Sequence, residues 1–304
     1  MKYTITGGAG HISKPLAEKL LSKGHEVTVI SRNAKNVAEL VVKGAKVAIG
    51  SLEDISFLTK AFAGADAVYT MVPPNMTASD WKGWIGQIGK NYMQAIKASG
   101  VKYVVNLSSI GADLPEGCGP VTGIHRAEDA LNELSNVHIR HLRPGYFYTN
   151  LLANIGMIKN IGIMGANFGG PSLKIVLAFP SDIAEVAAEE LSQLNFTGNS
   201  VRYIASDERT SEEIASVFGN AIGKPQLNWV VFNDADALKG MMQAGLPEEV
   251  AKNYVEMNHS LQSGEMSADY WENHPKTLQK TKLEDFSKIF AGIYSNEAAA
   301  AVLH

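Results

Sequence analysis

Short apolar runs alternate with helical stretches along residues 1–145, and this alternation limits the chain to few folds. The near-continuous Val and Ile content of several runs is typical of parallel strands that helices cover on both faces. The pattern therefore predicts an α/β fold built on a doubly wound parallel sheet. The candidate strands are residues 2–6, 26–31, 45–49, 66–72, 102–107 and 137–142.

The segments between these strands carry helical periodicity. Ile12, Leu16 and Leu20 recur every four residues, so they would share one face of a helix. Gly24 follows that helix in the position that favours a left-handed C-terminal cap. The repeated order of helix, glycine and strand supports the doubly wound sheet.

The alternation of predicted strands and helices ends after Pro144. Residues 151–175 have no clear period, and the sequence then predicts a helix at 181–193 and a strand at 201–205. From residue 209 onward the chain is predicted to be mainly helical. We expect a first domain at 1–150, to which 176–206 returns, and a smaller substrate lobe at 151–304. Low complexity is confined to Ala298–Ala301.

Composition narrows the class of protein. The 304 residues are 45% hydrophobic and carry a net charge of −4, which argues against a large surface for nucleic acid or anionic membrane. No apolar run approaches the roughly 18 residues of a membrane span, and the start shows no signal peptide. Cys118 is the single cysteine, and the eight histidines form no metal-binding motif. We expect a cytoplasmic monomer or homodimer that binds a small-molecule substrate and no metal.

The turn after the first strand reads TGGAGHISKPL. Glycines let the backbone approach a pyrophosphate closely, and the start of the next helix offers free N–H groups and a partial positive charge. Ser13 stands where the pattern usually has its last glycine, which serves mainly helix packing. We therefore predict a Rossmann-type sheet with a working dinucleotide site, whose first members are Gly7, Gly8, Gly10, His11 and Ile12.

The end of the second strand indicates which dinucleotide binds. Ser31 is followed by Arg32, with Lys35 just beyond and no carboxylate nearby. NAD-binding folds use an acidic residue here for the ribose hydroxyls, whereas a guanidinium can hold a 2′-phosphate. We predict NADPH in preference to NADH. The alternative is that Arg32 is a solvated residue at a strand end.

A proton donor common on this scaffold is missing. Many carbonyl reductases of this kind use a Tyr-x-x-x-Lys pair, in which the lysine lowers the pKa of the tyrosine. On the expected helix the group that titrates near neutrality is His125, with Asp129 four residues later. A solvated His–Asp pair is an equal alternative. Lysine stands four residues after none of the ten tyrosines, Tyr3, Tyr69, Tyr92, Tyr103, Tyr146, Tyr148, Tyr203, Tyr254, Tyr270 and Tyr294.

Several motifs together resemble the NmrA-like proteins, which are atypical members of the short-chain dehydrogenase superfamily. They are TGGAGHIS, Ser31-Arg32-Asn33, the segment Gly50–Val68, His125-x-x-x-Asp129, Leu142–Phe147 and Ser181–Ala184. The likeness covers residues 1 to about 225. That family includes NADPH-dependent quinone reductases, plant reductases of aromatic ethers and redox-sensing regulators. Residues 120–131 lack the lysine of the plant enzymes, and the quinone reductases resemble this chain better because they have a His followed four residues later by an acid.

The resemblance implies a layout for the site. His125 would lie beside the nicotinamide, the loop Val72–Asn75 would cover one side of the cofactor, and Phe147 would line the substrate side. Trp81 and Trp84 could form an apolar pocket wall, although core positions are slightly favoured for both. The other cofactor residues we expect are Ser51, Leu52, Val72, Pro73, Pro74, Asn75, Leu107, Ser108, Pro144 and Tyr146.

A quinone accepts hydride readily, so its enzyme mainly needs to hold the ring against the nicotinamide and exclude water. The missing Tyr/Lys pair is compatible with that chemistry and poorly compatible with reduction of a simple ketone. We therefore expect an NADPH-dependent reductase of quinone-like or conjugated acceptors, with His125 or solvent as the proton source. The alternative is a non-catalytic sensor that binds NADP(H). Sugar-nucleotide chemistry would need an acid that the sequence does not supply.

Overall fold

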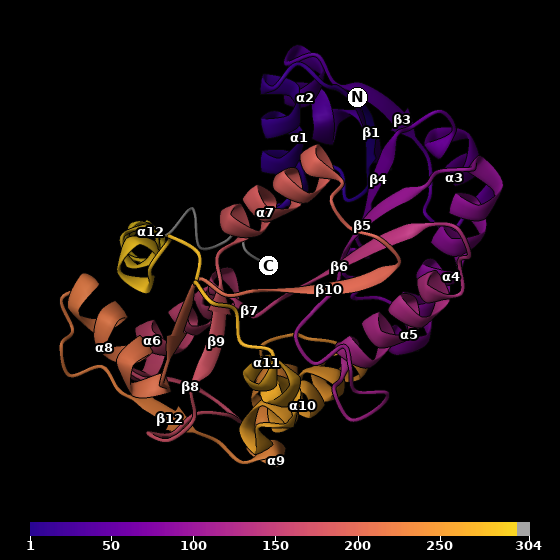
Figure 1. Ribbon diagram of the computed structural model, residues 1–304. Helices are drawn as coiled ribbons and strands as arrows, with labels where there is room; N and C mark the ends of the chain where they lie inside the picture. The colour runs from indigo at the N-terminus through magenta and orange to yellow at the C-terminus, as the bar shows by residue number, and fades with distance from the viewer. Residues whose placement is uncertain (297–304) are drawn as a thin grey trace. The chain divides into compact units, whose positions relative to one another are not determined.

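The computed structural model describes residues 1–296, and Ala298–Ala301 lies outside them. Its central sheet has seven strands in the order β10-β6-β5-β4-β1-β2-β3, and the neighbours from β6 to β3 pair in parallel (Figure 1). The order reverses between β1 and β4, where doubly wound sheets bind their ligands. The strands are β1 (Lys2–Ile5), β2 (Glu26–Ser31), β3 (Lys46–Ile49), β4 (Ala67–Thr70), β5 (Tyr103–Leu107), β6 (His138–Pro144) and β10 (Asn199–Ile204).

Helices cover both faces of this sheet. Figure 1 shows α3 (Ile55–Phe62), α4 (Trp81–Ser99) and α5 (Pro120–Asn132) along one face. The other face carries α1 (Ser13–Ser22), α2 (Ala38–Val42) and α7 (Pro180–Gln193), and a short 3-10 helix, η1 (Ala34–Val37), precedes α2. The two-layer cover explains why the strands are apolar on both sides, as the sequence predicted.

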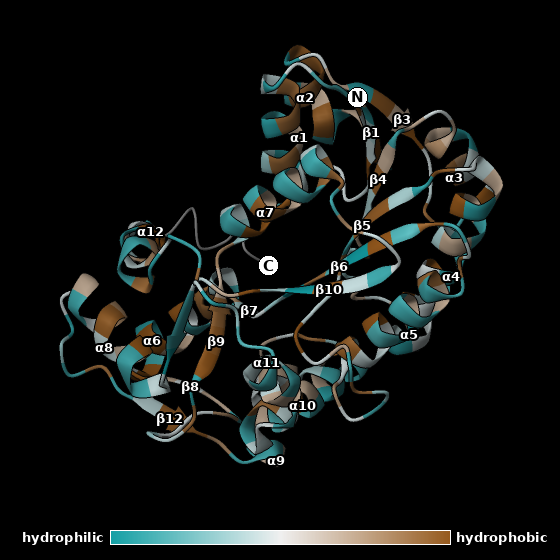
Figure 2. Ribbon diagram, in the orientation of Figure 1, coloured by the Kyte–Doolittle hydropathy of each residue, from teal (hydrophilic) through white to brown (hydrophobic). Residues whose placement is uncertain are grey.

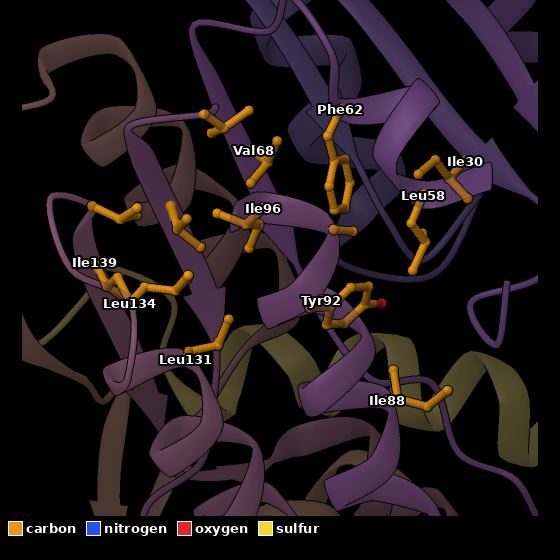
Figure 3. Close-up of a cluster of buried hydrophobic side chains, with 14 residues drawn as sticks. Ile30, Leu58, Phe62, Val68, Ile88, Tyr92, Ile96, Leu131, Leu134 and Ile139 are labelled. Carbon is orange, nitrogen blue, oxygen red and sulfur yellow. The ribbon is translucent and has the colours of Figure 1, made fainter. Parts of the chain in front are cut away.

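The core between the sheet and the α3–α5 layer is one cluster of buried side chains (Figure 3). Helix α4 contributes Ile88, Tyr92 and Ile96, which are spaced every four residues and therefore share a face. Helices α4 and α5 approach closely because Gly89 has no side chain: a Cβ there would lie 2.4 Å from the Cα of Ala127. This layer holds α5, and with it His125, against the sheet.

The chain divides into two compact units, each described here by itself. Unit 1 comprises Met1–Glu116, Pro120–Arg143 and Ile183–Arg202, and it contains the large sheet. Unit 2 comprises Gly117–Gly119, Pro144–Asp182 and the chain from Tyr203 onward. The observed division falls at Arg143, a few residues before the boundary predicted at residue 150, and the domain limits predicted from the sequence stay a proposal.

Unit 2 contains two small sheets, with strand orders β11-β9-β7 and β12-β8. Strand β9 is hydrophobic along its whole length in Figure 2, and all four of its residues are buried. The strands of unit 2 are β7 (Tyr146–Phe147), β8 (Met164–Ala166), β9 (Ile175–Ala178), β11 (Asp207–Arg209) and β12 (Trp229–Val231). Its helices are η2 (Tyr148–Asn154), α6 (Ile155–Ile161), α8 (Ser211–Ala221), α9 (Asp234–Gln243), α10 (Glu248–Ser263), η3 (Glu265–Ser267), α11 (Ala268–Glu272) and α12 (Leu283–Ser295).

The segment without a clear period, residues 151–175, holds α6 and β8 in the structure. Both elements are shorter than the window in which periodicity is visible, and Gly162 ends α6 with a φ of +75°. Gly24 likewise adopts a φ of +79°, which confirms the cap predicted after the first helix. Within residues 1–296, no helix is both long and apolar enough to cross a membrane.

Candidate functional site

The glycine turn joins β1 to α1 at the reversal of strand order. Gly7 and Gly8 have φ values of +86° and +57°, a region that side chains disfavour. The N–H of Gly8 donates to the carbonyl of Ile30 at 3.1 Å, which ties the turn to β2. The N–H of Gly10 donates to the carbonyl of Gly7 at 3.1 Å and closes the turn. The backbone alone therefore fixes its shape.

Ser13 sits directly beneath this turn and is 1% exposed. A Cβ on Gly7 would lie 2.5 Å from the Ser13 hydroxyl and 2.7 Å from the sulfur of Met71. Burial raises the pKa of Tyr69, and the neighbouring Ser13 hydroxyl opposes that rise. The serine thus replaces a packing glycine with a small polar group, and the space it occupies is available because Gly7 has no side chain.

The turn leaves donors and space for an anion. Within residues 1–296, the N–H groups of His11 and Ile12 donate to no other backbone group, whereas the next turn closes with Lys14 donating to Gly10 at 3.0 Å. Gly10 and the His11 side chain are exposed. Free amides at a helix start next to side-chain-free backbone are the features that a pyrophosphate needs. The residues present therefore fit a dinucleotide.

Exposed cations lie at the end of β2. Ser31 is buried, and its hydroxyl donates to the Asn33 carbonyl at 2.9 Å, so it orients the following bend. Arg32 and Lys35 are exposed, and in the described part of the chain their side chains form no ion pair. The nearby Lys14 is instead paired with Glu39 at 2.5 Å. Two unpaired cations beside the turn are suited to a phosphate.

The loop after β3 carries Ser51 and Leu52. The carbonyl of Leu52 accepts a hydrogen bond from Asn91 Nδ2 at 3.1 Å. The indole Nε1 of Trp84 donates to Glu53 Oε1 at 2.9 Å. Trp81 is 3% exposed, and Trp84 packs against the cluster of Figure 3. Both indoles therefore lie in or against the core, and a role for them in a substrate pocket stays a proposal.

His125 lies on α5 with its side chain 20% exposed. Its Nδ1 is 2.9 Å from the Ala112 carbonyl, which can only accept, so Nδ1 carries a proton. Its Nε2 is 3.1 Å from Asp129 Oδ2. Both ring nitrogens thus face oxygen acceptors, the Ala112 carbonyl and the Asp129 carboxylate. The sequence anticipated the Asp129 contact but not the one to Ala112.

A buried ion pair that the sequence did not predict lies next to the end of β5. Arg143 donates to both oxygens of Glu128, at 3.1 Å from Nε and 2.7 Å from Nη2. Ser108 also donates to Glu128, so its hydroxyl proton is engaged by this pair. A second contact joins Arg143 Nη1 to Asp113 at 3.7 Å. The sequence offered one sign of this ion pair, which is that Arg143 directly follows a predicted strand of the sheet. A charged side chain that is buried there needs a partner of opposite charge.

A neutral hydrogen-bonded chain continues beneath it. Thr70 donates to Asn106 Oδ1 at 2.9 Å, and Asn106 Nδ2 donates to His141 Nδ1 at 3.1 Å. His141 Nε2 then donates to Asn132 Oδ1 at 3.0 Å. Burial lowers the pKa of His141, and Glu128 opposes that effect. The chain couples β4, β5 and β6 to α5.

The other predicted residues fall into two groups. Leu107 is buried in unit 1, and the loop Val72–Asn75 is half-buried apart from Pro74, which is exposed. Pro144, Tyr146 and Phe147 belong to unit 2, where burial raises the pKa of Tyr146. Within residues 1–296 the structure shows no group of three His, Cys, Asp or Glu side chains suited to a metal ion. All predicted cofactor residues except Pro144 and Tyr146 therefore lie in unit 1.

Comparison with known proteins places this geometry in context. Residues 7–159 match the model of a family described as NAD(P)H-binding. The (4-alkanoyl-5-oxo-2,5-dihydrofuran-3-yl)methyl phosphate reductase of Streptomyces griseus is 24% identical over 264 residues, 86% of this chain and 87% of that protein. Quinone oxidoreductase 2 of Escherichia coli is 25% identical over 280 residues, 91% of this chain and 92% of that protein.

A solved structure shares the fold. The crystal structure of an NADPH-dependent quinone oxidoreductase from Escherichia coli has a TM-score of 0.77 to this chain. It is 23% identical and covers 94% of this chain and 98% of its own. The α/β, doubly wound Rossmann-type architecture predicted from the sequence is confirmed.

Proposed function

Because this chain belongs to the NAD(P)H-binding family, we propose that it is an NADPH-dependent reductase of quinone-like or other conjugated small molecules. This membership and the similarity to quinone oxidoreductase 2 bear out the NAD(P)H-binding reductase family that the resemblance to NmrA-like proteins implied. The two relatives described above are named a reductase and an oxidoreductase, which supports an oxidoreductase of the NAD(P)H-dependent type. The preference for NADPH and the class of acceptor are the finer parts of the proposal.

The observation that carries the proposal is the glycine turn beside unpaired cations. Gly7 and Gly8 give the close backbone approach, and the free amides of His11 and Ile12 suit a pyrophosphate. Arg32 supplies a forked donor for a 2′-phosphate. Bound NADPH would supply a hydride to the acceptor.

The acceptor class follows from what the site residues can do. A quinone-like electrophile takes hydride without a strong acid, which suits a site that has no Tyr-x-x-x-Lys pair. His125 is the side chain we propose as proton source, through Nε2, because Nδ1 is fixed on the Ala112 carbonyl. Asp129 Oδ2, 3.1 Å from Nε2, would orient the imidazole ring.

A second candidate function is that of a non-catalytic NADP(H) sensor, and one observation favours it. The two side chains best suited to donate a proton are both engaged by the protein, Ser108 by Glu128 and His125 by Ala112 and Asp129. A sensor needs only differential affinity for the oxidised and reduced cofactor.

The monomeric or dimeric state of the protein and its cytoplasmic location stay predictions from the sequence.

The experiment follows NADPH oxidation with a panel of quinones and conjugated enones. A reductase gives acceptor-dependent oxidation, and His125→Asn, which keeps a donor for the Ala112 carbonyl, lowers kcat by about a hundredfold where His125 is the acid. Unchanged turnover in His125→Asn would assign the proton to solvent. Tight binding of NADPH with no acceptor-dependent oxidation would reject the reductase and leave the sensor.

A further inference from the structure

The loop after β3 is held by one face of α4. Trp84, Gln87 and Asn91 lie on successive turns of that helix. Gln87 Nε2 donates to Asn91 Oδ1 at 3.0 Å, which turns the amide nitrogen of Asn91 toward the Leu52 carbonyl, 3.1 Å away. The indole of Trp84 donates to the carboxylate of Glu53 at 2.9 Å. Two consecutive loop residues are therefore fixed from one helix.

The same loop is fixed again at its ends. The Ser51 hydroxyl accepts from the N–H of Glu53 at 3.1 Å. Asp54 accepts from the N–H of Phe57 at 3.0 Å and caps α3. The Phe57 ring lies 2.6 Å from the position of a Cβ on Gly50, so the loop begins against that ring. These contacts are local to the loop, whereas Trp84–Glu53 and Asn91–Leu52 tie the loop to α4.

Three half-buried apolar side chains flank the buried cluster on this side of the sheet. Leu52, Val72 and Trp84 all pack against the buried cluster of Figure 3 and keep part of their surface exposed. Leu52 follows β3 and Val72 follows β4, so both lie at carboxyl ends of parallel strands, where a ligand of this sheet binds. A planar apolar ring fits such a surface.

We propose that Trp84 is a positioning residue for the adenosine half of the cofactor, acting through Glu53 on the loop of Ser51 and Leu52. The indole fixes the loop so that Leu52 presents its side chain to the adenine. This assigns Trp84 to the dinucleotide site instead of the substrate pocket. The inference rests on the proposed function, since it requires that NADPH binds in unit 1.

The experiment measures dissociation constants for NADPH and for its two halves, 2′,5′-ADP and reduced nicotinamide mononucleotide. Trp84→Phe keeps the ring and removes the donor, and Glu53→Ala removes the acceptor. Each is expected to weaken NADPH and 2′,5′-ADP by the same factor, about three- to tenfold, and to leave the mononucleotide unchanged. The double variant should lose no more than either single one, because both remove one contact.

Glu53→Gln is the matched control, since its amide oxygen still accepts from the indole, and its affinities should stay near those of the natural protein. Thermal unfolding of each variant reports whether it is folded. Two results would overturn the inference and leave the proposed function standing. One is an unchanged affinity for 2′,5′-ADP in a folded Trp84→Phe protein, and the other is an equal loss of affinity for the mononucleotide. Failure of the natural protein to bind NADPH and both halves overturns the proposed function and the inference with it.

Discussion

Gly7 is a residue of the dinucleotide turn at which the structure leaves little freedom. Its φ of +86° strains any side chain, and a Cβ there would collide with Ser13 and Met71. Gly7→Ala is expected to destabilise the protein by about 1–3 kcal/mol and to abolish measurable NADPH binding, because strain and overpacking act together. Urea unfolding and NADPH titration check the two effects.

Gly24 provides the matched control for that substitution. Its φ is +79°, yet no atom lies within 4 Å of the Cβ position. Gly24→Ala therefore carries the strain without the collision, and NADPH affinity should be unchanged. Equal loss of cofactor affinity in both variants would show that the collision at the turn is irrelevant.

At the scale of elements, the Glu128–Arg143 pair joins α5 to β6 and, through Ser108, to the end of β5. The two side chains are 5% and 9% exposed. Glu128→Ala removes the carboxylate that accepts two hydrogen bonds from the buried guanidinium and should cost about 3–5 kcal/mol of unfolding free energy. The exposed pair Glu116–Arg126 has a similar distance, 2.7 Å, and Glu116→Ala should cost at most about 1 kcal/mol. Similar losses in denaturant unfolding would contradict the role given to burial.

The neutral chain through His141 predicts a pH dependence. Burial lowers the pKa of His141 in the folded state below the value of about 6.5 of the unfolded chain. As pH falls below about 6.5, the unfolded chain takes up a proton that the folded chain refuses, so stability falls with pH in that window. Replacing His141 by Gln should flatten the slope of unfolding free energy between pH 7.5 and pH 5.5, both chosen to bracket about 6.5. The exposed His259→Gln variant is the control, and equal slopes in the natural protein and His141→Gln would contradict the prediction.

At the scale of the whole molecule, the sequence predicted what depends on local periodicity. The strands of the large sheet, the glycine turn and the left-handed cap at Gly24 follow from spacing and residue type, and the structure has them. The contacts of Glu128 could not be predicted, because its partner Arg143 is fifteen residues away on another element and the pairing depends on how α5 packs. The same holds for Trp84, whose partner Glu53 lies 31 residues earlier. The short elements of residues 151–175 were too brief for periodicity to reveal.

The central claim is that unit 1 binds NADPH through the glycine turn and Arg32, and the ratio of the dissociation constants for NADH and NADPH tests it most directly. A charge-assisted contact to the 2′-phosphate is worth about 1.5–3 kcal/mol, so the natural protein should prefer NADPH by about 10- to 100-fold. Arg32→Ala should bring the ratio close to unity, whereas Lys60→Ala, which removes an exposed cation from α3, should leave it unchanged. An equal affinity for both dinucleotides in the natural protein, or a preference that survives Arg32→Ala, would contradict the account.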